Sequence, residues 1–326
     1  MTKLPQPMAQ PHIWVVNSTY TGELQARIGL AERLGYPYEL IPLPNGDHAA
    51  YLQNLKHKYA SLAQPPLLVI SGTGEETTAE IADLKSQISE RLVNIYLASI
   101  LPENRHPRLA EYDLIASPQL TGANVVTLTS VPHPLTSNSL ASAYQQHARY
   151  FDSLPKPIIA LLVGGNTRYC FGFTEAHAQR LAERAVKIGQ ALNACIVVTN
   201  SRRTPQNALI ALIKALGDFP HYFFDWQQSE KNFYQALLAH ADVFIVTGDS
   251  LSMCSEATFT GKPVLIDLST EATECFHREI VGRLIDHGAA KVLSEHFEPW
   301  EYTPLDPTGT IADAIHSRFN HILKPF

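Results

Sequence analysis

The chain has 326 residues, of which 45% are hydrophobic and 17% are charged. This composition is typical of globular proteins rather than disordered ones, and the length suits two α/β domains. A formal net charge of −6 argues against a general nucleic-acid binder, which needs a basic face for phosphate contacts.

The N-terminal residues 1–7 contain no apolar core of signal-peptide length. No segment has the roughly 18 continuous apolar residues that a membrane span needs. We therefore expect a cytoplasmic protein, and we leave peripheral contact with the inner membrane open. The cysteines are widely spaced and form no CxxC motif, which favours reduced thiols over disulfides or a metal site; they are Cys170, Cys195, Cys254 and Cys275.

Apolar runs alternate with helical patterns through the first half of the chain. Helical spacing of apolar residues occurs over 23–34 and 49–62. The predicted strands are 12–16, 38–41, 66–71, 93–97, 112–116 and 124–128. Alternation of this kind predicts βαβ units and a parallel sheet covered on both faces.

Pro155 and Pro157 interrupt this pattern and favour an extended connector. A second series follows, with strands at 158–163, 194–199, 221–224, 243–246 and 264–266, and with helices beginning near 174, 205, 229, 250 and 273. The sequence therefore predicts two Rossmann-like domains, residues 1–154 and 155–305, whose parallel sheets face each other across a cleft. We expect the last segment, 306–326, to form a helix that packs back on the N-terminal domain.

The most informative segment is the polar stretch 247–256, which lies between the apolar runs 241–246 and 263–266. It predicts a helix that opens at the carboxyl edge of the sheet, where α/β proteins bind ligands. Ser252 and Glu256 are four residues apart and share one helical face, so Glu256 can accept hydrogen bonds from a ribose diol, with Ser250 nearby. Asp249 is the expected N-cap; it would repel a phosphate at this terminus.

Two further loops at predicted strand ends carry candidate ligand groups. Gly164, Gly165, Asn166 and Arg168 follow the strand 158–163, and paired glycines allow backbone amides to approach phosphate oxygens. The next strand ends in a loop whose side chains suit a diphosphate or a base; its candidates are Thr199, Ser201, Arg202 and Arg203. The alternative is a solvated arginine pair on the surface.

The first half offers weaker candidates. Gly72 and Gly74 form a Gly-x-Gly pair, but the third glycine of a dinucleotide fingerprint is missing. His133, between two prolines, and Glu23, in the first predicted helix, are candidate catalytic bases. The alternative for His133 is a packed or solvated loop residue.

Other chemistries lack their motifs. The sequence contains no P-loop, HExxH or GxSxG motif and no Asp-x-Asp pair. We therefore expect no metal site and no cofactor other than a nucleotide-diphosphate sugar as donor substrate.

Several of these segments together resemble one family. It comprises bacterial and plant proteins named for mitochondrial fission, the elongated-mitochondria proteins, long described as a domain of unknown function. The resemblance rests on 106–108, 112–115, 131–133, 162–168, 199–205, 249–256 and 276–277. Near the N-terminus the family has a Lys and a Gly-His or Gly-Met pair, whereas this chain has Tyr20 and Gly22-Glu23 and keeps Gln25.

More distantly, Ser255-Glu256 with Gly261 and Pro263 is similar to the ribose-binding helix of two-domain glycosyltransferases and related epimerases. This resemblance implies a glycosyltransferase-B architecture with a nucleotide-sugar between the domains. In plants the family's named role is recruitment of a fission machinery, which needs no chemistry.

The leading hypothesis is a metal-independent glycosyltransferase. Its second domain would bind a nucleotide-sugar, and its first would present an unknown, envelope-related acceptor; no nucleic acid is involved. The alternatives are a non-catalytic nucleotide-binding or scaffold protein of the family and a nucleotide-sugar epimerase of the same fold. The oligomeric state stays open.

Overall fold

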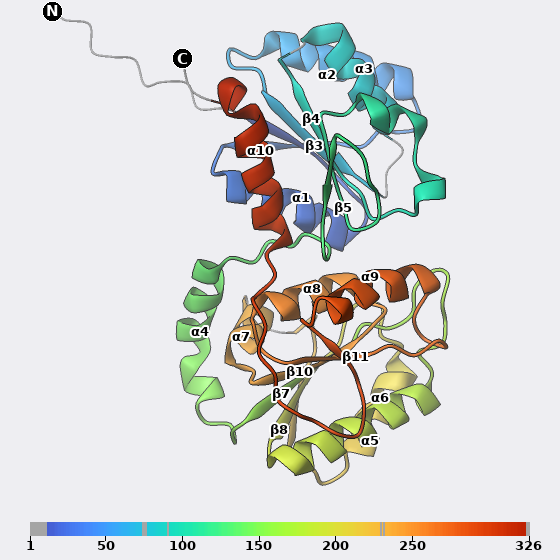
Figure 1. Ribbon diagram of the computed structural model, residues 1–326, viewed down its shortest axis with the longest axis vertical. Helices are drawn as coiled ribbons and strands as arrows, with labels where there is room; N and C mark the ends of the chain where they lie inside the picture. The colour runs from blue at the N-terminus through green and yellow to red at the C-terminus, as the bar shows by residue number, and fades with distance from the viewer. Residues whose placement is uncertain (1–11, 74–76, 90, 229, 231, 324–326) are drawn as a thin grey trace, which may run out of the picture. The chain divides into compact units, whose positions relative to one another are not determined.

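The computed structural model describes residues 12–73, 77–89, 91–228, 230 and 232–323 (Figure 1). The chain forms two compact units. Unit 1 is Met1–Pro134 with Asp306–Phe326, and unit 2 is Leu135–Leu305. The chain thus enters unit 2 well before the expected boundary at 154, because the helix that follows Pro134 packs on the second core. The predicted cleft between the sheets stays a prediction.

Unit 1 contains a six-stranded sheet among its described residues, with strand order β2-β1-β3-β4-β5-β6 and every neighbouring pair parallel. The strands are β1 (Ile13–Val16), β2 (Tyr38–Ile41), β3 (Leu68–Gly72), β4 (Val93–Leu97), β5 (Leu114–Ser117) and β6 (Val125–Thr127). The helices are α1 (Thr21–Leu34), α2 (His48–Ser61), α3 (Thr78–Ile88) and α10 (Pro307–Leu323), with short 3₁₀ turns at Pro102–Asn104 and Pro107–Glu111.

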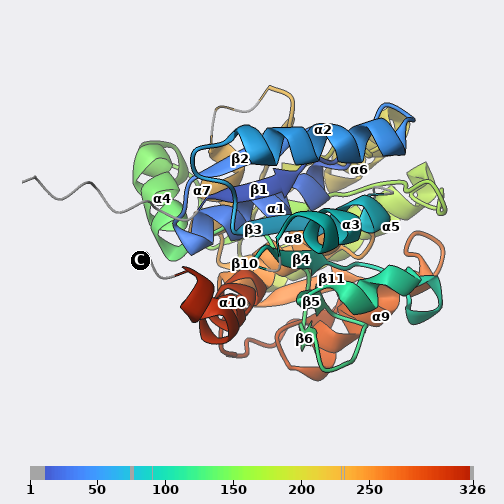
Figure 2. The ribbon, with the colours of Figure 1, turned by 90° about the horizontal axis from the view of Figure 1, so that it is seen from above.

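Helices cover both faces of this sheet, which explains why its central strands read as continuous apolar runs. On one face α1 and α10 lie side by side, and Leu30 and Ile311 share a core with Val15 (Figures 1 and 2). On the other face, α2 and α3 bury Leu55 and Ile81 against the sheet. Part of the chain's last helix therefore belongs to the core of unit 1.

Unit 2 repeats this design with strand order β12-β11-β10-β7-β8-β9, again all parallel in the described residues. Its strands are β7 (Ile158–Leu162), β8 (Cys195–Thr199), β9 (His221–Phe224), β10 (Val243–Thr247), β11 (Val264–Asp267) and β12 (Lys291–Val292). Its helices are α4 (Ser137–Phe151), α5 (Glu175–Leu192), α6 (Gln206–Leu216), α7 (Phe233–His240), α8 (Leu251–Phe259) and α9 (Cys275–Asp286).

Two apolar layers flank the second sheet. On one face α5 and α6 pack through Leu181 and Leu212. On the other, Phe151 of α4 and Phe233 of α7 share a core with α8 and α9. This packing of α4 is the physical reason for the early boundary.

Most predicted strands are present within one or two residues of their expected bounds. The helix expected from 229 begins at Phe233; residues 229 and 231, like Gly74 of the Gly-x-Gly pair, lie outside the described residues. In the part of the chain that the structure describes, no helix is long and apolar enough to span a membrane.

The strand order places a topological switch point in each sheet. In unit 2 the chain runs from β7 outward to β9 on one side and from β10 outward to β12 on the other. In unit 1 the corresponding neighbours are β1 and β3. Ligands of open α/β sheets bind outside the carboxyl ends of the strands at such a point, so the loops after β7 and β10 are the first place to look.

Candidate functional site

At the switch point of unit 2, the loop after β7 is bonded to the loop after β10. The Gly164 N–H donates to Thr247 Oγ1 at 2.8 Å, and the Gly165 N–H donates to Asp249 Oδ2 at 2.9 Å. The next amide, Asn166 N–H, donates to the Arg203 carbonyl at 3.1 Å. These three amides therefore serve the protein's own loops, and the phosphate contact expected of them is not available in this conformation.

Close packing explains the paired glycines. A Cβ on Gly164 would overlap the Asp249 carboxylate, and a Cβ on Gly165 would overlap the Arg203 carbonyl. Gly165 also has φ +143°, which other residues rarely adopt. The glycines thus allow three loops to meet.

Asp249 is the centre of this arrangement. Its side chain pairs with Arg203 Nη1 at 2.8 Å, and Arg203 Nη2 donates to the Asp249 carbonyl at 3.3 Å. The residue is 3% exposed, and desolvation raises the pKa of its carboxyl even though Arg203 opposes that shift. The N-cap of α8 is Ser250, so the expected capping role of Asp249 is wrong: its carboxylate bonds Gly165 and Arg203 instead.

Hydroxyl side chains also form hydrogen bonds between these loops. Ser201 Oγ donates to the Gly164 carbonyl at 2.6 Å, and Thr204 Oγ1 donates to the carbonyls of Gly164 and Val163. Thr199 is buried at the end of β8. Ser201 therefore supports the loops together with Thr204 and Thr247, two residues that were not predicted as site residues.

Glu256 lies on α8, directly behind this edge. It is half-buried, and Tyr234 Oη of α7 donates to its Oε2 at 2.7 Å. Burial raises the pKa of Glu256 to about 7, and the Tyr234 hydrogen bond lowers it. Its other oxygen, Oε1, accepts no hydrogen bond from the described residues. Ser252, also half-buried, lies one turn earlier on the same face.

The remaining predicted binding residues differ in how far they are exposed to solvent. Arg202 is exposed, and so is Arg168, whose guanidinium lies 4.7 Å from the ring centroid of Tyr169. Asn166 uses Oδ1 to accept from the Phe173 amide at 3.0 Å. Ser250 is buried, and its N–H donates to the Thr247 carbonyl. Among these residues, the two arginines are the exposed ones.

Two residues of this edge were not predicted as site residues. Trp226 follows β9, is 40% exposed, and has its N–H bonded to Asn200 Oδ1 at 2.9 Å. His277 lies in the first turn of α9, and desolvation lowers its pKa while Glu274 opposes that shift. Trp226 could have been found from its position just after a predicted strand, where the other candidate residues also lie. His277 could have been found from segment 276–277, which is part of the family resemblance.

The switch point of unit 1 is closed differently. Arg27 of α1 is buried, and its guanidinium donates to the carbonyls of Val16 at 2.8 Å, Asn17 at 2.7 Å and Thr73 at 2.8 Å. Glu23, the predicted base, is half-buried one turn earlier on this helix. Sequence reasoning missed Arg27, because an arginine in an amphipathic helix reads as a surface residue.

His133, the other predicted base, is 1% exposed. Its backbone is clamped to Thr308 of α10, which accepts from the His133 N–H and donates to its carbonyl. Desolvation lowers the pKa of His133 to about 4, so the ring is neutral at pH 7. This geometry favours the packed-residue alternative, and the base roles of Glu23 and His133 stay predictions.

Comparison with known proteins agrees with this architecture. The family model described as mitochondrial fission ELM1 matches residues 21–319. The mitochondrial fission protein ELM1 of Arabidopsis thaliana is 28% identical over 286 residues, which cover 77% of this chain and 63% of the plant protein. This chain thus matches less than two thirds of that relative's length.

Solved structures of low identity share the fold. The UDP-GlcNAc 2-epimerase of Methanocaldococcus jannaschii has a TM-score of 0.60 at 12% identity, with 94% of this chain and 99% of that chain covered. Acinetobacter baumannii MurG has a TM-score of 0.51 at 13% identity, with coverage of 97% and 91%. The fold is therefore of the glycosyltransferase-B type. By its sequence, the chain belongs to the mitochondrial fission ELM1 family.

Proposed function

We propose that unit 2 binds a nucleotide-diphosphate sugar along the carboxyl edge of its sheet. Glu256 and Ser252 of α8 bind the ribose, and Arg202 contacts the diphosphate. Arg203 contributes mainly by holding Asp249 and the loop after β7, because its guanidinium is already committed to that carboxylate.

The main support for this proposal is the hydrogen bonding of the Glu256 carboxylate. Tyr234 fixes one carboxyl oxygen and leaves the other without a protein donor among the described residues. An acceptor held by one hydrogen bond, half-buried beside a switch point, suits a pair of hydroxyl donors such as a ribose diol. Binding such donors would repay the desolvation of the carboxylate.

The charges around the phosphate site are consistent with an anionic ligand. Asp249 would repel a diphosphate if it were unpaired, but Arg203 neutralises it at 2.8 Å. The exposed Arg202 is then the cation next to this neutral pair. We therefore assign the diphosphate to the Arg202 side of the loop rather than to the 164–166 amides.

The reaction that follows is a metal-independent glycosyl transfer. An acceptor hydroxyl oxygen forms a bond to the sugar's anomeric carbon, the bond from that carbon to the diphosphate oxygen breaks, and the acceptor proton leaves to a base. The nucleoside diphosphate departs with its bonding electrons, and Arg202 stabilises the negative charge that develops there. No residue is assigned to the base.

Calorimetric titration of the full chain with a panel of nucleoside diphosphates and nucleotide-sugars tests binding. Wild type should bind at least one member, and Glu256→Gln should weaken it, whereas the exposed Glu298→Gln control should not. Failure to bind any member would refute the proposal. Sugar release or transfer by a binder supports the enzyme, and binding without turnover supports the non-catalytic alternative.

A further inference from the structure

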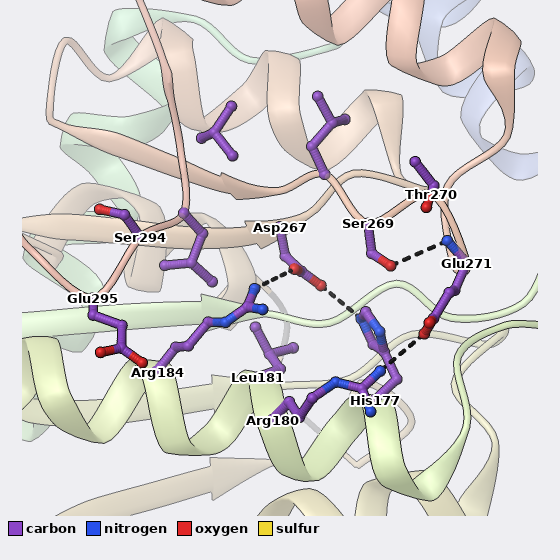
Figure 3. A pocket seen from close by; sticks show the side chains of 13 residues that line it. His177, Arg180, Leu181, Arg184, Asp267, Ser269, Thr270, Glu271, Ser294 and Glu295 are labelled. Carbon is purple, nitrogen blue, oxygen red and sulfur yellow. Dashed lines mark hydrogen bonds and ion pairs between the residues drawn. The ribbon is translucent and has the colours of Figure 1, made fainter.

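Unit 2 contains a cavity of about 720 Å³ that none of the proposed nucleotide-binding residues lines. It opens beside α5, against the segments that follow β11 and β12 (Figure 3). Its lining includes the apolar side chains of Leu181, Leu268 and Leu293. The volume falls in the range of small-molecule sites, about 300–1,000 Å³.

Every carboxylate that lines this cavity already has a cationic or imidazole partner. Asp267, at the end of β11, contacts His177 Nε2 at 2.6 Å and Arg184 Nη1 at 3.3 Å. Glu271 pairs with Arg180 at 2.9 Å, and Glu295 pairs at 2.6 Å with a lysine outside the lining set, Lys187. The negative charge of each lining carboxylate is therefore compensated by a partner.

The donor capacity is largely unused. Arg180 and Arg184 lie one turn apart on α5, so both guanidinium groups reach the same cavity (Figure 3). Each makes one side-chain hydrogen bond among the described residues, out of five N–H groups. Both side chains are partly exposed, and an exposed pair such as Arg180–Glu271 is weak enough for another anion to displace.

His177 supports the wall of the cavity. His177 is 4% exposed, lines the cavity, and bonds Asp267 through Nε2. Its Nδ1 has no hydrogen-bond partner in the described part of the chain. This nitrogen is itself buried, so it is not counted among the donors and acceptors that a ligand in the cavity would meet.

Hydroxyl side chains from two further segments also line the cavity. Ser269 and Thr270 follow β11, and Ser294 follows β12. The Ser269 oxygen accepts from the Glu271 amide, so its O–H remains able to donate. Ser294 Oγ already donates to the His296 carbonyl at 2.8 Å, so the available donors come from α5 and from the segment after β11. Several N–H and O–H donors match the three terminal oxygens of a phosphate monoester better than the two of a carboxylate.

We propose that this cavity binds a small phosphate monoester, with Arg180 and Arg184 on the phosphate and the lining leucines against the rest of the molecule. The site is separate from the nucleotide site of the proposed function and does not depend on it. The paired carboxylates keep the cavity close to electrically neutral, so the selectivity comes from hydrogen-bond geometry rather than from net charge.

Phosphorus NMR and calorimetry on the full chain test this, with glycerol 3-phosphate, inorganic phosphate and acetate as the probes. We expect saturable binding of glycerol 3-phosphate and about tenfold weaker binding in Arg180→Gln, the loss of one charged contact. Glu271→Gln, which frees Arg180, should tighten binding. Arg283→Gln, an exposed arginine on α9, is the matched control and should change nothing.

Two further variants separate this site from the nucleotide site. Arg202→Gln and Glu256→Gln should leave glycerol 3-phosphate binding unchanged. The proposal is overturned if Arg180→Gln binds like wild type, if Arg202→Gln abolishes binding, or if acetate binds as tightly as the phosphate ester. A circular dichroism spectrum of each variant checks the fold.

Discussion

In each unit a buried charged side chain holds the loops at the switch point of the sheet, but the two charges have opposite sign. In unit 1 the switch point between β1 and β3 is sealed by the buried cation Arg27, which donates to three backbone carbonyls. In unit 2 the switch point between β7 and β10 is sealed by the buried anion Asp249, which accepts from a backbone amide and pairs with Arg203. Both loops are thus tied by side chains of their own unit.

The difference bears on where a ligand can bind. Arg27 is wholly buried, whereas the Asp249–Arg203 pair lies beside the exposed Arg202 and the half-buried Glu256. At this edge unit 2 therefore keeps accessible polar side chains, which are the ones that the proposed function uses. A glycine-rich loop at a strand end is not by itself a phosphate loop, because its amides can be satisfied internally.

Replacing either buried charged residue should have the largest effect on the free energy of unfolding. Arg27→Met leaves three carbonyls without their donor, and Asp249→Ala leaves Arg203 without its partner. Arg27→Met should cost about 3–5 kcal/mol in unit 1, and Asp249→Ala about 1–3 kcal/mol in unit 2, because the Arg203 side chain that loses its partner is partly exposed. Native-state hydrogen exchange of strand amides reads the two units separately: Arg27→Met should deprotect β1, and Asp249→Ala should deprotect β7. If either variant deprotected both sheets equally, the claim that each buried charge stabilises only its own unit would be wrong.

The two units should also respond to pH in opposite directions. His133 in unit 1 has its folded pKa lowered to about 4 from 6.5, so between these values only the unfolded chain takes up the proton. The stability contributed by the neutral ring is present above pH 6.5 and is lost as the pH falls towards 4, by up to about 3 kcal/mol.

Glu256 in unit 2 has its pKa raised to about 7 from 4.5. Its contribution is present below pH 4.5 and is lost as the pH rises through 7. Exchange measurements between pH 4 and 8 on wild type, His133→Gln and Glu256→Gln check both signs. If His133→Gln keeps the acid-induced loss of protection in β1, the assignment to this ring is wrong.

Ligand affinity gives a smaller but more specific effect. Glu256→Gln should weaken nucleotide binding by about 1–3 kcal/mol, the usual loss when a charged hydrogen-bond acceptor is removed. Because the ionised carboxylate is the better acceptor, wild-type affinity should also fall as the pH drops below 7, and the variant should lose this dependence. Calorimetry at pH 6 and pH 8 measures both. A pH dependence that persists in the variant would point to another group.

Arg202 should give the smallest effect. Arg202→Gln should reduce affinity for a nucleoside diphosphate by about 0.5–1 kcal/mol, because an exposed charge is largely screened. Affinity for the bare nucleoside should be unchanged, and the loss should shrink as salt is raised. A variant that binds the diphosphate like wild type at low salt would leave the phosphate site unassigned.

Local pattern predicted most of the fold. Strands buried on both faces appear as continuous apolar runs, and this is why β1, β7 and β10 were found nearly at their bounds. The helix α4 was missed because it contains few large apolar residues: only Ala143 and Phe151 are buried, with Leu140 and Tyr150 partly buried against the same core. Because α4 packs on the core of unit 2, that unit begins at Leu135 rather than after residue 154.

The site was harder to predict because its contacts are long-range. The partners of the Gly164 and Gly165 amides, Thr247 and Asp249, lie more than 80 residues away in sequence. Spacing alone therefore could not distinguish amides open to phosphate from amides bonded to a carboxylate. Glu256 was predictable because its helix directly follows a buried strand, and its position needs no distant partner to be inferred.

The most direct test of nucleotide binding at unit 2 compares ribose with deoxyribose. The tightest nucleoside diphosphate from the panel and its 2′-deoxy form are titrated by calorimetry into wild type and into Glu256→Gln. We predict that wild type prefers the ribose form by roughly tenfold, about 1.4 kcal/mol, and that the variant binds both forms alike. Equal affinity of wild type for the two forms would show that Glu256 does not bind the diol and would contradict the proposed site.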